Sequence, residues 1–397
     1  MSTTAAALSY ARSTGQPRRL ALDPWVIGTV AALLLIGLVM VASASIGIAE
    51  KETGQAFYYF RHQVVYVLCG LVAALIGLAV PTRYWEKCSI YLLVGAFVML
   101  VLVLIPGIGA SVNGARRWVR LGVMNFQVSE AARVMLLTYI ASVAVRRADE
   151  LRADFKGFMK PVGVLAAAAA LLLLEPDFGA ATVLMATGFA LLFLAGVRLH
   201  HLLVPVVLGV GAMGALAVSS PYRLRRLIAF LNPWSDPFNS GFQLVQSLIA
   251  IGRGEWFGVG LGASVQKLFY LPESHTDFVF AVLAEEFGFF GVAVVIGLFA
   301  LLVGRALKIA RDAGAAGLPF QSYLAAAIGI WLGLQSFVNI GVNMGLLPTK
   351  GLTLPLLSYG GSSMLVTLGW LGVLLRINHE TQTAGRSATG AREGRRT

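Results

Sequence analysis

The sequence predicts an all-α polytopic membrane protein with about ten transmembrane helices and a large extracytoplasmic loop between the seventh and eighth helices. Of its 397 residues, 57% are hydrophobic and only 13% are charged, whereas soluble domains carry roughly a quarter charged residues. The mean hydropathy of +0.78 agrees with this class. Apolar runs of about twenty residues, long enough to cross ~30 Å of hydrocarbon as helices, recur along the chain.

The first apolar run, residues 25–48, follows a polar N-terminal tail at 1–24. Its Ala42-Ser43-Ala44 resembles a signal-peptidase site, but the run is longer than the roughly 7–15 apolar residues of a signal peptide, so we expect a retained helix. Nine further spans are expected at 63–80, 90–105, 130–145, 161–174, 180–197, 202–219, 278–303, 323–346 and 354–377. The membrane domain thus covers 25–377, with the large loop at 220–277 and a basic tail at 378–397.

The basic residues predict the orientation of these spans. Ten spans place both termini on one side, and with both termini cytoplasmic most of the 31 Lys and Arg residues fall in the tails and inner loops. The short outer loops then hold only Lys51, Arg61, Arg116, Arg117, Arg120 and Lys350. This bias follows the positive-inside rule and places the large loop outside. The net charge of +12 is therefore explained by topology and lipid headgroups, and we expect no nucleic-acid partner.

A polar stretch leads directly into the eighth span. It runs from Leu271 to Phe278 and contains Glu273, His275 and Asp277. Asp277 stands at the boundary, where its carboxylate can reach water while the membrane holds its backbone. An Asp at this position is also a favoured helix N-cap, and its charge suits the helix dipole. A functional role and a capping role therefore both stay open.

Three arginines on the outer face, Arg116, Arg117 and Arg120, oppose the positive-inside trend. They indicate a specific anionic partner such as a phosphate, a pyrophosphate or a lipid headgroup, or simple contact with anionic lipid. Glu130 and Arg133 follow at i,i+3 spacing, which places them on one helix face where they can pair. Ionisable groups inside a span are functional candidates, although a structural ion pair explains them as well.

Two glycine-rich stretches complete the outer face. Gly258-Val259-Gly260-Leu261-Gly262 is a weak dinucleotide signal because no strand precedes it; we expect turns of half-buried backbone beside a cavity. Residues 345–363, dense in Pro, Gly and Ser, interrupt the entrance to the last span. Within them Lys350 would offer a cation, and close helix packing is the alternative reason for the small residues.

Four segments resemble signature segments of the SEDS family (shape, elongation, division and sporulation). They are Pro272-Glu273-Ser274-His275-Thr276-Asp277-Phe278, Pro348-Thr349-Lys350-Gly351, Ser358-Tyr359-Gly360-Gly361-Ser362-Ser363, and Glu175-Pro176-Asp177-Phe178-Gly179, which is similar to the family's Gln-Pro-Asp-Leu-Gly turn. The resemblance covers residues 25–377, and the stretches 41–45, 60–63 and 241–254 favour the cell-division branch over the elongation branch. One departure is at 128–133: the family often has a proline at the position of Val128 and a lysine at that of Arg133, so any role that needs a lysine is in doubt.

The resemblance implies a peptidoglycan glycosyltransferase that polymerises lipid II into glycan strands during septal wall synthesis, with the family's essential aspartate at Asp277. Joining two sugars needs a base for the proton of the acceptor 4-hydroxyl and stabilisation of the departing pyrophosphate. Asp277 is expected to be that base or to position a divalent ion, in a single inverting displacement. The expected substrate-binding residues are Arg116, Arg117, Glu130, Arg133, His275, Lys350 and Ser358.

No metal-ligand cluster is visible in the sequence, so a Mg²⁺ or Mn²⁺ cofactor would have to be shared with the pyrophosphate. The partners implied by the resemblance are lipid II, the growing glycan strand, a class B penicillin-binding protein (the septal transpeptidase of the FtsI type) and other divisome membrane proteins. The implied location is the bacterial cytoplasmic membrane at the division septum.

Two other functions fit a ten-span protein with a lipid substrate. A lipid II flippase would carry charged residues along a path that reaches the inner side, whereas the polar motifs here cluster on the outer face. A non-catalytic scaffold that activates a transpeptidase would tolerate Asp277→Ala but not changes on its helix surfaces.

Overall fold

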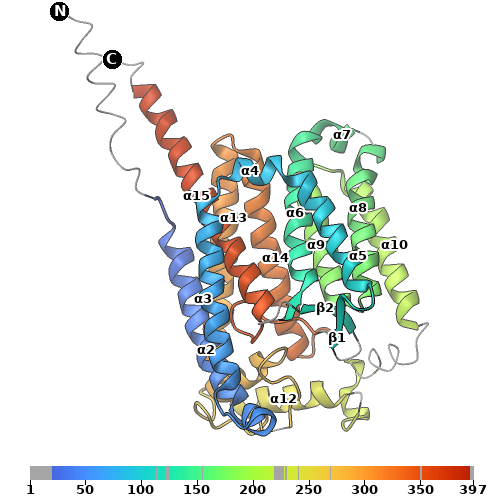
Figure 1. Ribbon diagram of the computed structural model, residues 1–397, viewed down its shortest axis with the longest axis vertical. Coiled ribbons are helices and arrows are strands. Elements are labelled where there is room, and N and C mark those ends of the chain that lie inside the picture. The colour runs from blue at the N-terminus through green and yellow to red at the C-terminus, as the bar shows by residue number, and fades with distance from the viewer. Residues whose placement is uncertain are drawn as a thin grey trace, which may run out of the picture.

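The described part of the chain forms a bundle that contains ten long helices (Figure 1). The computed structural model describes residues 20–112, 115–120, 125–153, 155–218, 228, 230–239, 241–268, 270–348 and 351–393, with backbone only for a few of these. The long helices are α2 (Pro24–Thr53), α3 (Tyr58–Ala79), α5 (Ser89–Leu104), α6 (Val128–Arg146), α8 (Phe155–Leu174), α9 (Phe178–Leu194), α10 (Leu199–Val218), α13 (Val279–Ala315), α14 (Pro319–Asn343) and α15 (Gly361–Glu393). Each expected span coincides with one of them.

Six of these helices are long and apolar enough to cross a membrane: α2, α3, α6, α8, α13 and α14. Helices α5, α9 and the first part of α10 are shorter but apolar. The prediction of a polytopic helical membrane protein is therefore confirmed, while ten membrane crossings remain a prediction. Helices α6 and α14 bury the largest share of their apolar windows, 72% and 67%, so the polar residues they carry face protein rather than lipid.

The last helix differs most from its expected range. It begins at Gly361 instead of 354 because the chain first makes a turn, in which the Ser358 amide donates to the Leu354 carbonyl (3.0 Å) and Leu356 has a φ of 67°. Its far end continues to Glu393, through most of the segment expected to be a tail. Helix α13 likewise extends past residue 303, to Ala315.

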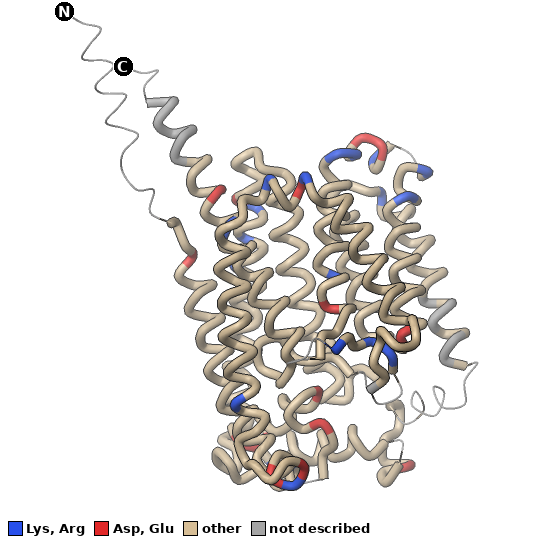
Figure 2. Tube along the Cα trace, viewed as in Figure 1, with Lys and Arg blue, Asp and Glu red and all other residues tan. Residues whose placement is uncertain are grey.

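Both described chain ends lie at the same end of the bundle (Figure 1). The Ala21 amide donates to His379 Nδ1 (3.1 Å) and the Asn378 side chain donates to the Ala21 carbonyl (3.0 Å). Nearby, Asp23 pairs with Arg305 at the inner part of α13. The short helices α4 (Thr82–Lys87) and α7 (Ala148–Ala153) lie at this end too, where Figure 2 shows many of the basic residues. This arrangement agrees with an even number of crossings.

A small antiparallel sheet, which the sequence analysis did not predict, joins α5 to α6. Its strands are β1 (Gly109–Val112), β2 (Ala115–Arg120) and β3 (Asn125–Gln127), in the order β1-β2-β3. Gly109 fits beneath the end of α5, where a Cβ would lie 1.8 Å from the Val103 carbonyl oxygen. The sheet gives the arginines of β2 a defined place beside the bundle.

The large loop contains a short 3-10 turn, η1 (Pro233–Ser235), and helix α12 (Phe242–Gly254). After α12 the loop backbone forms hydrogen bonds with α13 at the point where that helix is interrupted, at Gly288, whose φ is 63°. The amides of Val259 and Gly260 donate to the carbonyls of Glu285 and Glu286 (2.9 and 3.1 Å), which satisfies acceptors that the break leaves free. Gly258, Gly260 and Gly262 all have positive φ, as expected for glycines that turn the backbone.

Two buried carboxylates fasten this loop to the bundle. The Glu285 side chain accepts from the Ser264 hydroxyl (2.5 Å) and pairs with Arg253 of α12 (3.2 Å). The Glu286 side chain pairs with Lys267 of the loop (2.8 Å) and accepts from the Ser43 hydroxyl of α2 (2.7 Å). Both charges are buried, so each needs these partners.

Candidate active site

The stretch before α13 is held by backbone contacts that fix Asp277. The amides of Thr276 and Phe278 donate to the Glu273 carbonyl (3.2 and 3.1 Å), and Glu273 has a φ of 58°. The Asp277 carbonyl accepts from the side chains of Asn339 and Asn343 of α14 (2.9 and 3.1 Å). Asp277 is thus positioned through its main chain, which leaves its side chain free for another task.

The Asp277 carboxylate does not cap α13. The N-cap of this helix is Phe278, with no side-chain capping hydrogen bond, and among the described residues the carboxylate accepts no hydrogen bond. It lies against Gly351, where a Cβ would be 3.0 Å from Asp277 Oδ2. The capping alternative therefore has no support in the geometry, because the N-cap position of α13 is occupied by Phe278, one residue after Asp277.

The surroundings of this carboxyl disfavour its charge. Although part of the Asp277 side chain stays accessible, burial of the carboxyl raises its pKa to about 7. Glu273 adds to the rise, Arg117 of β2 opposes it and Asp177 adds a smaller rise. A carboxyl with a pKa near neutrality is suited to proton transfer at physiological pH.

Asp177 belongs to the turn between α8 and α9 and is fully engaged. Its Oδ1 accepts from the Ala180 amide (3.0 Å), which caps α9, and its Oδ2 accepts from Ser129 Oγ (2.9 Å) and Gln127 Nε2 (3.1 Å). These bonds tie the α8–α9 turn to the start of α6. The sequence indicated this turn only through its resemblance to the family turn, and its place near Asp277 comes from the structure.

Glu175 in the same turn is a buried acid without a partner. Its side chain has 0% exposure, and neither carboxyl oxygen has a hydrogen-bond partner among the described residues. Burial raises the pKa of the Glu175 carboxyl to about 8, Asp177 adds to the rise and Arg117 opposes it. The acid is therefore mostly protonated at neutral pH, which makes it equivalent to the glutamine of the similar family turn.

Glu175→Gln should stabilise the protein at pH 8 and much less at pH 5. The folded state holds a proton on Glu175 up to pH of about 8 and the unfolded state only up to about 4.3, so the stability of the wild type falls as pH rises between these values. Gln removes this dependence. We expect the melting temperature of the variant in detergent to exceed that of the wild type by roughly 5 °C at pH 8.

The matched control is Glu50→Gln, which changes an exposed acid near the end of α2 and should raise the melting temperature at neither pH. If the Glu175→Gln variant melted below the wild type at both pH values, Glu175 would be ionised and paired instead of protonated.

Glu130 and Arg133 form the ion pair that their spacing predicted. Both are almost fully buried, with 4% and 1% exposure. Arg133 Nη1 also donates to Gln335 Oε1 of α14 (3.1 Å), whose Nε2 donates to the Thr353 carbonyl (3.1 Å). This chain of bonds connects α6 to the segment 351–360 opposite Asp277.

His275 and Ser358 lie on the other side of Asp277. The His275 ring contacts the rings of Tyr59 and Tyr359 at centroid distances of 4.6 and 5.5 Å, and burial lowers its pKa, so the ring is neutral. Its Nδ1 is buried and has no hydrogen-bond partner among the described residues. Ser358 Oγ accepts from the Leu354 amide (2.8 Å), so this hydroxyl holds the turn before α15.

The remaining expected residues fall into two groups. Arg117 lies near Asp277, Asp177 and Glu175, as their shared electrostatics show, whereas Arg116 Nη1 donates to the Leu104 carbonyl at the end of α5 (3.3 Å). Lys350 lies outside the described residues. The structure thus brings β2 (Arg117), α6 (Glu130 and Arg133) and the stretch before α13 (His275 and Asp277) together, while the substrate-binding roles stay predictions.

Sequence reasoning missed Asn339 and Asn343. They are four residues apart on α14, and this i,i+4 spacing on an otherwise apolar helix was a signal for one polar face. Gln335 continues the same face one turn earlier.

The geometry supports a general-base reaction next to an anionic leaving group. A carboxyl of raised pKa faces an arginine from β2, and a second arginine is held in α6 by a buried carboxylate. Among the described residues no group of three or more metal-ligating side chains converges.

Comparisons with known proteins agree on one family. The family model described as "Cell cycle protein", which covers FtsW, RodA and SpoVE, matches residues 24–383. A relative from Thioalkalivibrio sulfidiphilus is 55% identical over 368 residues, which cover 93% of this chain and 92% of the relative. A relative from Halorhodospira halophila is 56% identical over 363 residues, which cover 91% and 92%. Both carry the name probable peptidoglycan glycosyltransferase FtsW.

Solved structures show the same fold. A chain from a structure described as "Structural coordination of polymerization and crosslinking by a peptidoglycan synthase complex" has a TM-score of 0.75 and 31% identity, covering 91% of this chain and 99% of that chain. The rod-shape-determining protein RodA of Thermus thermophilus has a TM-score of 0.69 and 30% identity, covering 92% and 99%. The chain therefore belongs to the FtsW, RodA and SpoVE family of cell cycle proteins.

Proposed function

We propose that this protein polymerises lipid II into glycan strands during septal wall synthesis, with Asp277 as the general base. The peptidoglycan glycosyltransferase activity is supported by relatives that carry this name and share more than half of their residues with the chain over nine-tenths of its length. The observation that carries the role of Asp277 is its geometry: a carboxylate on the loop-bearing side of the bundle, fixed through its backbone and free of any capping bond.

In the proposed reaction, the Asp277 carboxylate takes the proton of the acceptor 4-hydroxyl as the oxygen attacks the anomeric carbon of the donor. The bond to the undecaprenyl pyrophosphate breaks from the opposite side, so that the configuration inverts to a β-1,4 linkage. Arg117, whose charge acts on Asp277, is proposed to stabilise negative charge on the departing pyrophosphate. Arg116, Arg133 and Lys350 are proposed to contact the pyrophosphates, with Glu130 holding Arg133.

A divalent cation, Mg²⁺ or Mn²⁺, would take most of its oxygen ligands from the pyrophosphate, because such ions prefer phosphate oxygens together with one or two carboxylates. The described residues offer no full set of protein ligands.

The proposed partners are a class B penicillin-binding protein of the FtsI type and other membrane proteins of the divisome. This partnership is supported by the likeness to a chain from a synthase complex that coordinates polymerization and crosslinking. The proposed location is the cytoplasmic membrane at the septum, with both termini in the cytoplasm.

The polymerase function is tested by a gel assay in which the purified protein, with its transpeptidase partner blocked at the transpeptidase site, forms glycan strands from fluorescent lipid II. A complex without polymerase activity would leave the flippase or the scaffold as the function.

The rate of polymerisation should rise with pH through an apparent pKa near 7. Only the deprotonated Asp277 can accept the proton, and the pKa of this carboxyl is raised to about 7, so the rate should fall about tenfold for each pH unit below that value. The measurement is the initial rate between pH 5 and 8, with partner binding checked at each pH. A flat profile over this range would count against the general-base role.

A further inference from the structure

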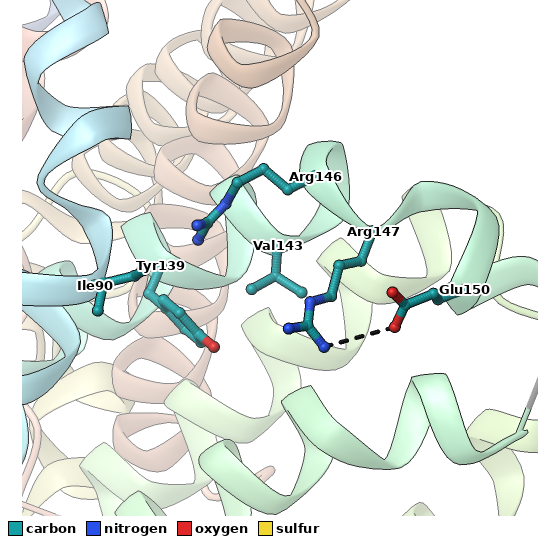
Figure 3. Close-up of a pocket in the computed structure, with 6 residues that line it drawn as sticks. All are labelled: Ile90, Tyr139, Val143, Arg146, Arg147 and Glu150. Carbon is teal, nitrogen blue, oxygen red and sulfur yellow. Dashed lines mark ion pairs between the residues drawn. The ribbon is translucent and has the colours of Figure 1, made fainter.

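A polar cavity of ≈ 240 Å³, drawn with its lining residues in Figure 3, lies beside α7 at the end of the bundle that holds both chain ends. It is lined by Ile90 of α5, by Tyr139, Val143 and Arg146 of α6, and by Arg147 and Glu150 at α7. The glycosyltransferase reaction makes no use of these residues.

One arginine of the cavity is held in place by buried serines. Arg146 Nη2 donates to Ser89 Oγ (3.3 Å), and Ser89 Oγ donates to Ser142 Oγ (3.0 Å). Both serines have 0% exposure. This chain of bonds connects α5 to α6 and uses one donor of a guanidinium that has five, which leaves the others available to a ligand.

The charges around the cavity sum to a positive value. Arg147 Nη1 lies 3.5 Å from Glu150 Oε2 across the cavity, as Figure 3 shows, and Lys160 Nζ contacts the same carboxylate oxygen (3.2 Å). The single acid among the cavity residues is thus shared by two cations, while Arg146 has no acidic partner among the described residues. An anion is therefore favoured here over a cation.

The residues that line the cavity run from the charged end of α6 towards its apolar middle. Tyr139 precedes Arg146 by two turns of helix, or about 10 Å along its axis, and lies inside the expected span 130–145. Half of the Ile90 side chain is exposed and can contact an acyl chain. A ligand that fills this space has an anionic group at one end and an apolar part at the other.

We propose that the cavity binds an anionic phospholipid from the membrane leaflet on this side. The phosphate lies between Arg146 and Arg147, the Tyr139 hydroxyl reaches the ester region, and an acyl chain follows Ile90. Arginine is well suited to this role because its planar fork binds phosphate through two hydrogen bonds. Basic pockets between membrane helices on the cytoplasmic side recognise anionic lipid headgroups in this way.

The full chain, purified in detergent, would be titrated with phosphatidylglycerol and with phosphatidylcholine of the same acyl chains, and the bound lipids counted by native mass spectrometry. We expect the wild type to prefer phosphatidylglycerol and the Arg146→Ala/Arg147→Ala variant to bind it about tenfold more weakly. The matched control is Arg198→Ala/Lys308→Ala, which removes two exposed cations from the same end of the bundle and should retain the preference.

A second variant, Ile90→Trp, fills the cavity from its exposed side without changing any charge, and it should also weaken binding. Equal binding by the wild type and the double-alanine variant, with both folded as judged by melting temperature, would overturn the proposal. Inorganic phosphate that displaced the lipid at equal concentration would also overturn it, because the site would then recognise a soluble anion. Loss of binding in the Ile90→Trp variant alone would assign the affinity to the acyl chain, against the proposed phosphate site.

Discussion

Asp277→Asn should lower the rate of lipid II polymerisation by at least about 100-fold, the smallest effect expected when a general base is removed. Asn has the same shape as Asp but cannot accept the proton at neutral pH. The substitution leaves the contacts that position residue 277 intact, since Asn339 and Asn343 donate to its main-chain carbonyl. The fold and partner binding should therefore persist while the chemistry is lost.

This experiment needs a control that removes an acid from the same outer face. Asp236→Asn serves, because Asp236 lies in the large loop near η1 and accepts a hydrogen bond from Asn239 (2.9 Å) that an amide oxygen can also accept. We expect near wild-type strands from this variant. Equal strands from Asp277→Asn would remove Asp277 as the base, and strands lost together with partner binding would point to the scaffold function.

A third variant separates electrostatics from proton transfer. Glu273→Gln removes a charge that helps to raise the pKa of Asp277, so the pKa of Asp277 should fall and the pH–rate profile should move to lower pH. An activity profile that did not move would mean that Asp277 and Glu273 are not coupled.

The sequence was sufficient for the parts of the fold that depend on local patterns. Each apolar run became a helix, because a spanning segment must satisfy its backbone hydrogen bonds internally. The Glu130–Arg133 pair followed from i,i+3 spacing on one helix. The site at Asp277 was found by its position at a span boundary and by resemblance to signature segments, since no local rule identifies a base.

The contacts that could not be predicted join residues distant in the chain. Asp177 reaches Gln127 and Ser129 across the bundle, and nothing in the turn at 175–179 indicates these partners. The sheet was missed because its strands are short and because β2, with three arginines among its six residues, shows no period-2 pattern of apolar residues. Arg116 was expected at the anionic substrate, yet it donates to the end of α5, a contact that depends on how the sheet folds back.

Arg133→Met should destabilise the protein by roughly 3–5 kcal/mol, the usual cost of removing one partner from a buried ion pair. Glu130 would keep a carboxylate with only 4% exposure, and its second oxygen already has no partner among the described residues. Thermal unfolding in detergent measures the loss. Lys160→Met is the control, because the pair of Lys160 with Glu150 is exposed on both sides and such pairs contribute about 0–1 kcal/mol.

The double variant Glu130→Gln/Arg133→Met distinguishes a structural pair from a substrate-binding one. It removes both charges and leaves no uncompensated carboxylate, so most of the lost stability should return, as it does when buried pairs are replaced together. If Arg133 binds the pyrophosphate, the double variant will be stable but inactive. If the pair only connects α6 to Gln335 and the segment opposite Asp277, activity will return with stability.

Arg133→Lys tests whether the charge or the planar guanidinium of Arg133 is needed. A lysine keeps the charge that the family often has here but loses the second guanidinium contact, to Gln335. Activity retained in this variant would show that the charge matters and that the planar fork does not.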